Sequence, residues 1–153
     1  MQEGTDWKKI MTQNYELAEE CVHTNYYGAK RTTEALIPLL QLSDSPRMVN
    51  ERMLTQFLKD FKEGSIESKG WPAFTPGYIL SKAAVNAYTR VLAKKYPDFR
   101  INCLCPGFIK TDLNFNAGNV PVEEGAAKVL KLAFLPNDGP SGFFFVESEV
   151  TGF

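Results

Sequence analysis

Residues 77–107 read GYILSKAAVNAYTRVLAKKYPDFRINCLCPG, and this stretch decides the fold. The segment 78–96 has the apolar spacing of a helix, and Pro97 marks its end. Residues 100–105 then form a short apolar run typical of a buried strand, which a Pro-Gly turn stops. A helix followed at once by a buried strand and a turn indicates an α/β protein.

The same alternation of helix and strand continues outward from this stretch. Helical spacing of apolar residues extends over residues 13–42, 51–63 and 121–134. A very short β-like run occupies residues 47–50, and a short apolar strand is expected over residues 142–146. Gly28 interrupts the first helix, and Pro38 is expected to bend or end it. The order of these segments predicts an α/β fold with parallel strands joined by right-handed crossovers.

Composition argues against several classes of protein. The 17 basic and 18 acidic residues are scattered, so no nucleic-acid or membrane surface is expected. No apolar run approaches the roughly 18 residues of a membrane span, and the first residues do not form a signal peptide. Three cysteines and one histidine offer too few ligands for a structural zinc site, so no metal is expected. The thiols are expected to be buried and to belong to a reducing compartment, and a cytoplasmic protein is expected.

One pair of side chains indicates chemistry. Tyr78 and Lys82 lie four residues apart, so a helix places the phenol and the ammonium on one face. An ammonium beside a phenol favours the phenolate, and such a phenol can pass a proton to a carbonyl oxygen while hydride arrives at carbon. Tyr26 and Lys30 have the same spacing, so spacing alone fits an ordinary helix-surface contact better.

The residues that follow Tyr78 favour a catalytic role for it. The strand after its helix ends in the turn Pro106-Gly107, and ligands of open α/β sheets bind at the carboxyl ends of strands. Thr111 follows this turn. Its hydroxyl is placed either to hydrogen-bond a cofactor amide or to cap the turn, as Thr-Asp pairs often do.

Three longer segments make the pattern specific. They are TNYYGAKRTTEALIPLLQLSDSPRMVN (24–50), GYILSKAAVNAYTRVLAKKYP (77–97) and INCLCPGFIKTDLNFNAG (101–118). Together they resemble the short-chain dehydrogenase/reductase family, in particular its plant menthone, neomenthol and salutaridine reductases. The resemblance implies that residues 1–153 form one partial Rossmann-like domain. This domain would be the C-terminal part of a doubly wound parallel sheet, with about three strands and flanking helices.

The resemblance also implies roles for residues that match the family's motifs. Tyr78 would be the general acid and base, and Lys82 would hold the nicotinamide ribose and favour the phenolate. Asn25 would match the family's asparagine, which kinks its helix and anchors a proton-relay water. The cofactor-binding residues would be Tyr78, Lys82, Pro106, Gly107 and Thr111, and the substrate would contact Gly77, Phe108 and Phe115.

Three parts of the family's pattern have no counterpart in this sequence. No Gly-rich turn of the G-x-x-x-G-x-G kind is present to approach a pyrophosphate, and there is no Asn-Asn-Ala-Gly segment. The family's catalytic serine follows its fifth strand in a Val-Ser-Ser run, whereas here Asn50 leads directly into Glu51. Ser65 and Ser68 precede Tyr78 but lie in an insertion, not at a strand end. The first four strands are therefore expected to be missing, with an internal gap after Asn50.

These observations lead to two expectations about function. The first is an NADP(H)-dependent oxidoreductase that interconverts a small ketone and a secondary alcohol, of the terpenoid or alkaloid kind. NAD(H) is the alternative cofactor, because the selecting residues follow strands that are not present. This chain would be a truncated form with little activity alone. The second is a catalytically silent fragment that acts as a binding or interaction module. The intact protein is expected to be a monomer, whereas the fragment would self-associate through bare apolar faces.

Overall fold

The computed structural model describes residues 12–40, 51–147 and 149–151. The chain divides into two compact units, and the boundary falls inside helix α5 (Pro76–Lys95), between Tyr88 and Thr89. The part up to Tyr88 is the helical unit, and the part from Thr89 is the sheet unit. None of the described helices combines the length and the hydropathy that a membrane span requires.

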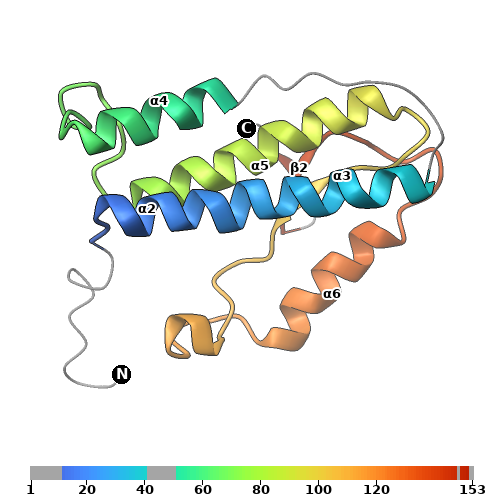
Figure 1. Ribbon diagram of the computed structural model, residues 1–153. Helices are drawn as coiled ribbons and strands as arrows, with labels where there is room; N and C mark the ends of the chain where they lie inside the picture. Colours follow the sequence, from blue (N-terminus) through green and yellow to red (C-terminus); the bar gives the residue numbers. More distant parts are fainter. Residues whose placement is uncertain (1–11, 41–50, 148, 152–153) are drawn as a thin grey trace. The chain divides into compact units, whose positions relative to one another are not determined.

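The helical unit begins with a long helical rod. It consists of α2 (Tyr15–Val22), the π-helical turn η1 (His23–Gly28) and α3 (Ala29–Leu40), which follow one another without a break in Figure 1. Asn14 caps its first turn, because the side-chain oxygen accepts a hydrogen bond from the backbone N–H of Leu17 at 2.9 Å. A cap of this kind stabilises a helix by about 1 kcal/mol.

The rod agrees with the predicted helix over residues 13–42 and adds one feature. The sequence indicated an interruption at Gly28, and the structure shows a six-residue π turn that ends at this glycine. The described helix reaches Leu40, two residues beyond Pro38, and the remainder of the predicted segment lies outside the described residues.

The core of the helical unit lies between the rod, α4 (Glu51–Lys62) and the first part of α5. Its buried apolar side chains are Ala18, Val22, Tyr26, Leu54, Phe57, Leu80, Ala84 and Tyr88. Burying a large apolar side chain such as Phe57 contributes about 2 kcal/mol. Helices α2 and α5 approach closely at Gly77, since a Cβ atom there would lie 2.7 Å from Cα of Ala18.

A loop between α4 and α5 closes over a buried carboxylate. Both oxygens of Asp60 accept hydrogen bonds, from Lys69 Nζ at 2.7 Å, Gln56 Nε2 at 2.7 Å and Trp71 Nε1 at 2.9 Å. The Trp71 ring also packs edge-on against Phe57, with 5.5 Å between the centroids. These contacts fix the loop that leads directly into α5.

The sheet unit contains three short strands. β1 (Cys103–Cys105) pairs in parallel with β2 (Phe144–Val146), with Leu104 opposite Phe145, and β2 pairs antiparallel with β3 (Glu149–Thr151). Helix α6 (Val122–Ala133) lies between β1 and β2 in the chain, which makes the parallel pair a strand–helix–strand crossover.

The strands test the sequence interpretation in detail. The predicted strands over residues 100–105 and 142–146 are confirmed, although the hydrogen-bonded part of each is three residues long. The predicted burial of the first strand is wrong, because Cys103 and Leu104 are half-buried and Cys105 is exposed in the structure. The predicted run at residues 47–50 lies outside the described residues. β3 was not predicted, because its sequence, Glu149-Val150-Thr151, has no apolar run. The described residues thus form a small mixed sheet with helices, as expected for part of an α/β fold.

Candidate active site

Tyr78 lies in the first turn of α5 with its side chain 52% exposed. Lys82 follows one turn later, and its Nζ lies 5.6 Å from the centroid of the Tyr78 ring. The predicted placement of both groups on one helix face is therefore correct. The second pair of the same spacing differs, because the Tyr26 side chain is only 1% exposed and stacks edge-on against Tyr27 and Tyr88. Of these two tyrosines, Tyr78 is the exposed one.

Asn25 projects from the π turn toward the start of α5. Its Nδ2 donates to Ser81 Oγ at 3.1 Å and to Cys21 Sγ at 3.2 Å. Ser81 is fully buried, and its Oγ donates in turn to the backbone oxygen of Tyr78 at 2.8 Å. Two of the predicted catalytic residues, Asn25 and Tyr78, are thus joined through one serine hydroxyl.

Ser81 was not identified from the sequence, although a signal was present. It shares a helix stripe with Gly77, Ala84 and Tyr88, which recur at intervals of four, three and four and are buried. A polar residue on a buried helix stripe needs a hydrogen-bond partner, so its position in the pattern predicts a buried hydrogen bond.

Gly77 is placed against the rod. Its backbone N–H donates to Gln13 Oε1 at 2.9 Å, and its α-carbon faces Ala18 at a distance that leaves no room for a side chain. This arrangement gives Gly77 a packing role at the start of α5, and contact with substrate stays a prediction.

The serines in the described residues are bonded to nearby groups. Ser65 Oγ donates to the backbone oxygen of Asp60, and Ser68 Oγ donates to that of Ser65. Ser141 Oγ donates to Phe99 O at 2.9 Å and accepts from the Ile101 N–H at 3.0 Å. These bonds, together with the burial of Ser81, give all four a structural role in this part of the chain.

In the sheet unit, the Pro106-Gly107 turn follows β1 as predicted. Gly107 is exposed and has φ 94°, a left-handed conformation that favours glycine. Lys128 of α6 holds this turn, because its Nζ donates to Pro106 O at 3.2 Å and pairs with Glu124 at 3.2 Å. Lys128 is a second residue that the sequence interpretation missed.

Thr111 is a capping residue in the structure. It precedes a short 3₁₀ helix, η2 (Asp112–Asn114), and forms a reciprocal pair of hydrogen bonds with Asn114. Of the two roles open at the sequence level, the cap is the one observed. The Thr111 N–H donates to Asn114 Oδ1 at 3.2 Å, and the Asn114 N–H donates to the backbone oxygen of Thr111 at 3.2 Å.

The segment after the turn is a closed loop that displays aromatic side chains. Ile109 and Val120 form a parallel bridge, and the N–H groups of Asn119 and Val120 both donate to Phe108 O. Phe108 and Phe115, the predicted substrate contacts, are both exposed. Gly118 permits the closure, since a Cβ atom there would overlap the backbone of Ile109.

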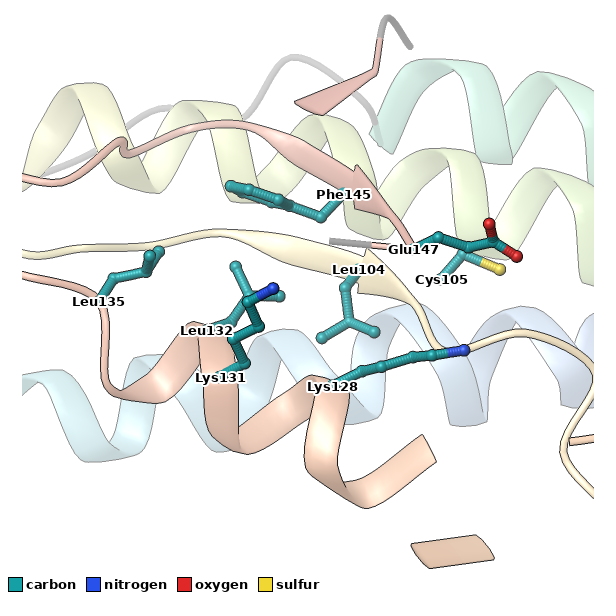
Figure 2. Close-up of a pocket in the computed structure, with 8 residues that line it drawn as sticks. All are labelled: Leu104, Cys105, Lys128, Lys131, Leu132, Leu135, Phe145 and Glu147. Carbon is teal, nitrogen blue, oxygen red and sulfur yellow. The ribbon is translucent and has the colours of Figure 1, made fainter. Parts of the chain in front are cut away.

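A pocket lies beside the end of β1, between the parallel strands and α6 (Figure 2). Its lining residues are Leu104, Cys105, Lys128, Lys131, Leu132, Leu135, Phe145 and Glu147. In Figure 2 the Leu104 side chain points into the space on the α6 side of β1. The pocket is largely apolar, with charged side chains at its rim. In the described residues, no group of three His, Cys, Asp or Glu side chains is arranged to hold a metal ion.

Comparison with known proteins places this geometry in context. Residues 4–139 match a protein family described as Enoyl-(Acyl carrier protein) reductase. The chain is 50% identical to "Short-chain dehydrogenase/reductase 1" of Saponaria officinalis, covering 94% of this chain and 58% of the relative. It is 52% identical to "(+)-neomenthol dehydrogenase" of Capsicum annuum, covering 92% and 54%. The solved structure of salutaridine reductase from Papaver somniferum is similar with a TM-score of 0.81 and 46% identity, covering 94% and 59%.

The chain spans less than two thirds of the length of these relatives, and the match itself contains a gap. The match with the Saponaria protein extends over 175 positions, whereas this chain has 153 residues. The relative therefore carries at least 22 residues within the match that have no counterpart here. This agrees with the internal gap predicted from the sequence. On the family match and these similarities, the chain belongs to the short-chain dehydrogenase/reductase family.

Proposed function

We propose that the protein containing this chain is an NADP(H)-dependent oxidoreductase that interconverts a ketone and a secondary alcohol of the terpenoid or alkaloid kind. The observation that carries the proposal is the exposed Tyr78 phenol with the Lys82 ammonium 5.6 Å from its ring centroid. Two relatives at 46–52% identity, a neomenthol dehydrogenase and a salutaridine reductase, support this substrate class by their names. Carbonyl reductases named for NADPH match at 26–28% identity and support the cofactor.

In this proposal Tyr78 moves the proton. During reduction its phenol donates to the carbonyl oxygen, and during oxidation its phenolate takes the alcohol proton. The ammonium of Lys82 would hold the ribose of the cofactor. Asn25 would anchor a water that resupplies the proton. When bound, the nicotinamide supplies or accepts the hydride.

The sheet unit would supply the nicotinamide side of the binding site. The fit rests on the exposed Gly107, whose lack of a side chain lets a flat ring approach the backbone of the turn. Pro106 and Gly107 would lie against the ring, and the hydroxyl of Thr111 would donate to a polar group of the cofactor. Phe108 and Phe115 would contact the apolar part of the substrate.

The phosphate end of the cofactor has no matching motif in this sequence. A Gly-rich turn before a helix N-terminus supplies most of the contacts to a pyrophosphate, and the 153 residues contain none. We therefore propose that the 153-residue chain alone binds NADP(H) weakly and turns over little substrate. The free thiols of Cys21, Cys103 and Cys105 support a reducing compartment, and we propose the cytoplasm.

The test compares two proteins. One is the 153-residue chain, and the other is a chimera that adds the segments of the Saponaria relative that have no counterpart here. We expect the chimera to reduce salutaridine with NADPH or oxidise (+)-neomenthol with NADP⁺. We expect Tyr78→Phe to lower kcat at least ~100-fold, the lower end of general acid–base contributions. Tyr15→Phe, which changes a tyrosine bonded to Glu19, is the matched control. A chimera that keeps its rate with Phe at position 78 would refute the proposal.

A further inference from the structure

We propose that Lys128 is a positioning residue that sets how tightly the cofactor binds, because it fixes the Pro106-Gly107 turn from the α6 side. The inference rests on the proposed function, in which this turn lies against the nicotinamide. It starts from one fact: the Lys128 side chain is only 18% exposed, although it ends in an ammonium and belongs to a helix whose other residues are mostly exposed.

The ammonium of Lys128 lies directly beside the turn. Its Nζ donates to the backbone oxygen of Pro106 at 3.2 Å, and it lies 3.8 Å from the position that a Cβ atom of Gly107 would occupy. Figure 2 shows the side chain extended from α6 toward the point where the chain leaves β1. The ammonium therefore faces the side of Gly107 on which a side chain would project.

The turn depends on this bond more than a turn of other residues would. Gly107 has φ 94°, and a glycine can leave such a conformation easily because no Cβ atom restricts its backbone. Pro106 O belongs to the peptide plane that precedes Gly107, so the bond from Lys128 holds the orientation of that plane. A hydrogen bond from an ammonium is also stronger than one between neutral groups.

Glu124 keeps the ammonium in the position that reaches the turn. Its Oε1 lies 3.2 Å from Lys128 Nζ, and the two residues are four positions apart on α6. Because the carboxylate is 57% exposed, the pair contributes little to stability by itself. Its consequence is directional, since it restricts a long side chain to one conformation. The turn is thereby tied to a regular helix of 12 residues.

A fixed turn should bind a flat ring more tightly than a turn that samples several conformations. The apparent dissociation constant rises in proportion as the binding conformation becomes less populated. Lys128 acts through the backbone of Pro106 and Gly107 and has no part in moving the proton. Its removal is therefore expected to weaken cofactor binding and to leave the chemical step unchanged.

The first test observes the turn by NMR in the 153-residue chain, with isotope-labelled glycine that gives a backbone signal for each of 11 glycines. We expect Lys128→Met, which keeps the apolar stem and removes the donors, to shift the Gly107 signal, because the peptide that contains this N–H loses the bond to its oxygen. Lys128→Arg should restore most of the parent signal. Lys131→Met is the matched control, since Lys131 is exposed on the same helix and lines the same pocket. An unaltered Gly107 signal in Lys128→Met would overturn the inference, and so would an equal shift in Lys131→Met.

The second test measures cofactor binding in the chimera, by titration with NADPH followed through nicotinamide fluorescence. Lys128→Met should raise Kd and KM for NADPH about fivefold, as expected if the binding conformation of the turn falls to about a fifth of its population. At saturating NADPH, kcat should stay within twofold of the parent value, and Lys128→Arg should recover most of the affinity. A fall in kcat with unchanged Kd would contradict the positioning role. If the chimera binds NADPH but turns over no ketone or alcohol, the proposed function fails, and the comparison of Kd values still decides the role of Lys128. A chimera that does not bind NADPH would refute both.

Discussion

At the scale of single residues, spacing alone could not distinguish Tyr78 from Tyr26. Both tyrosines precede a lysine by four positions, but Tyr78 is half exposed and Tyr26 is buried in an aromatic cluster. The longer sequence context selected Tyr78, because a strand that ends in Pro-Gly follows its helix. Burial itself depends on packing between helices, which residue spacing within one helix does not encode.

A prediction at this scale concerns Gly77. In Gly77→Ala, the new Cβ would lie 2.7 Å from Cα and 2.9 Å from O of Ala18, and backbone atoms cannot move aside cheaply. We expect a loss of about 1–3 kcal/mol in the free energy of unfolding, measured by urea denaturation. Gly28→Ala is the matched control. Its Cβ would approach only His23 O, at 3.6 Å, so this variant should be neutral or slightly more stable. Equal midpoints for Gly77→Ala and the parent would contradict the expectation.

At the scale of elements, the helices and the parallel strands followed from periodicity, and the irregular parts did not. The π turn depends on contacts made by residues 23–28, and the sequence shows only the glycine at its end. The loop before α5 depends on Asp60, which occupies a polar position in a regular helix pattern. The donors to the Asp60 carboxylate are Gln56, Lys69 and Trp71, which lie up to 11 residues away in the sequence. No short-range sequence pattern predicts that they meet.

The Asp60 loop gives a pH prediction. Hydrogen bonds from Lys69 first, and then from Trp71, hold the pKa of the Asp60 carboxyl below its ordinary value. A depressed pKa in the folded state contributes stability above the ordinary carboxyl pKa, and this contribution is lost as pH falls through the folded value. We expect Trp71 fluorescence, recorded with Trp7 replaced by Phe, to report an acid transition that opens the loop. Asp60→Asn should show the opened spectrum at neutral pH, whereas Asp138→Asn, at an exposed turn, should behave like the parent. If Asp60→Asn leaves the Trp71 fluorescence spectrum unchanged, the Asp60 carboxylate does not hold the loop closed.

At the scale of the whole molecule, the sequence indicated a partial α/β fold, and the family match and the solved relative agree with it. The sequence could also indicate missing motifs, because a Gly-rich turn and a Val-Ser-Ser run are local signatures. The third described strand escaped prediction, since β3 takes its position from pairing with β2 and not from its own composition.

A final prediction concerns association of the chain. Leu130 lies in the last turn of α6, Phe134 is the C-cap residue that follows this helix, and Phe134 is 81% exposed. Exposed apolar side chains of this size favour association, so we expect the 153-residue chain to form oligomers at micromolar concentration in sedimentation velocity. Phe134→Glu should shift the population toward monomer, whereas Lys131→Glu, on the same helix, changes charge without removing apolar surface. A parent chain that stays monomeric at high concentration would show that these side chains do not drive association.

In the closed loop after the Pro106-Gly107 turn, one set of groups holds the backbone in place and a different set of side chains is exposed. The loop is held by backbone hydrogen bonds between residues 108–110 and 119–120. It is also held by the close approach of Ile109 to Gly118, which has no side chain to prevent it. Exposed side chains of the loop, such as that of Leu113, take no part in these backbone contacts. The exposed side chains of this loop can therefore be substituted one at a time, which changes the groups that the loop offers to a ligand. The backbone conformation of the loop is expected to stay the same.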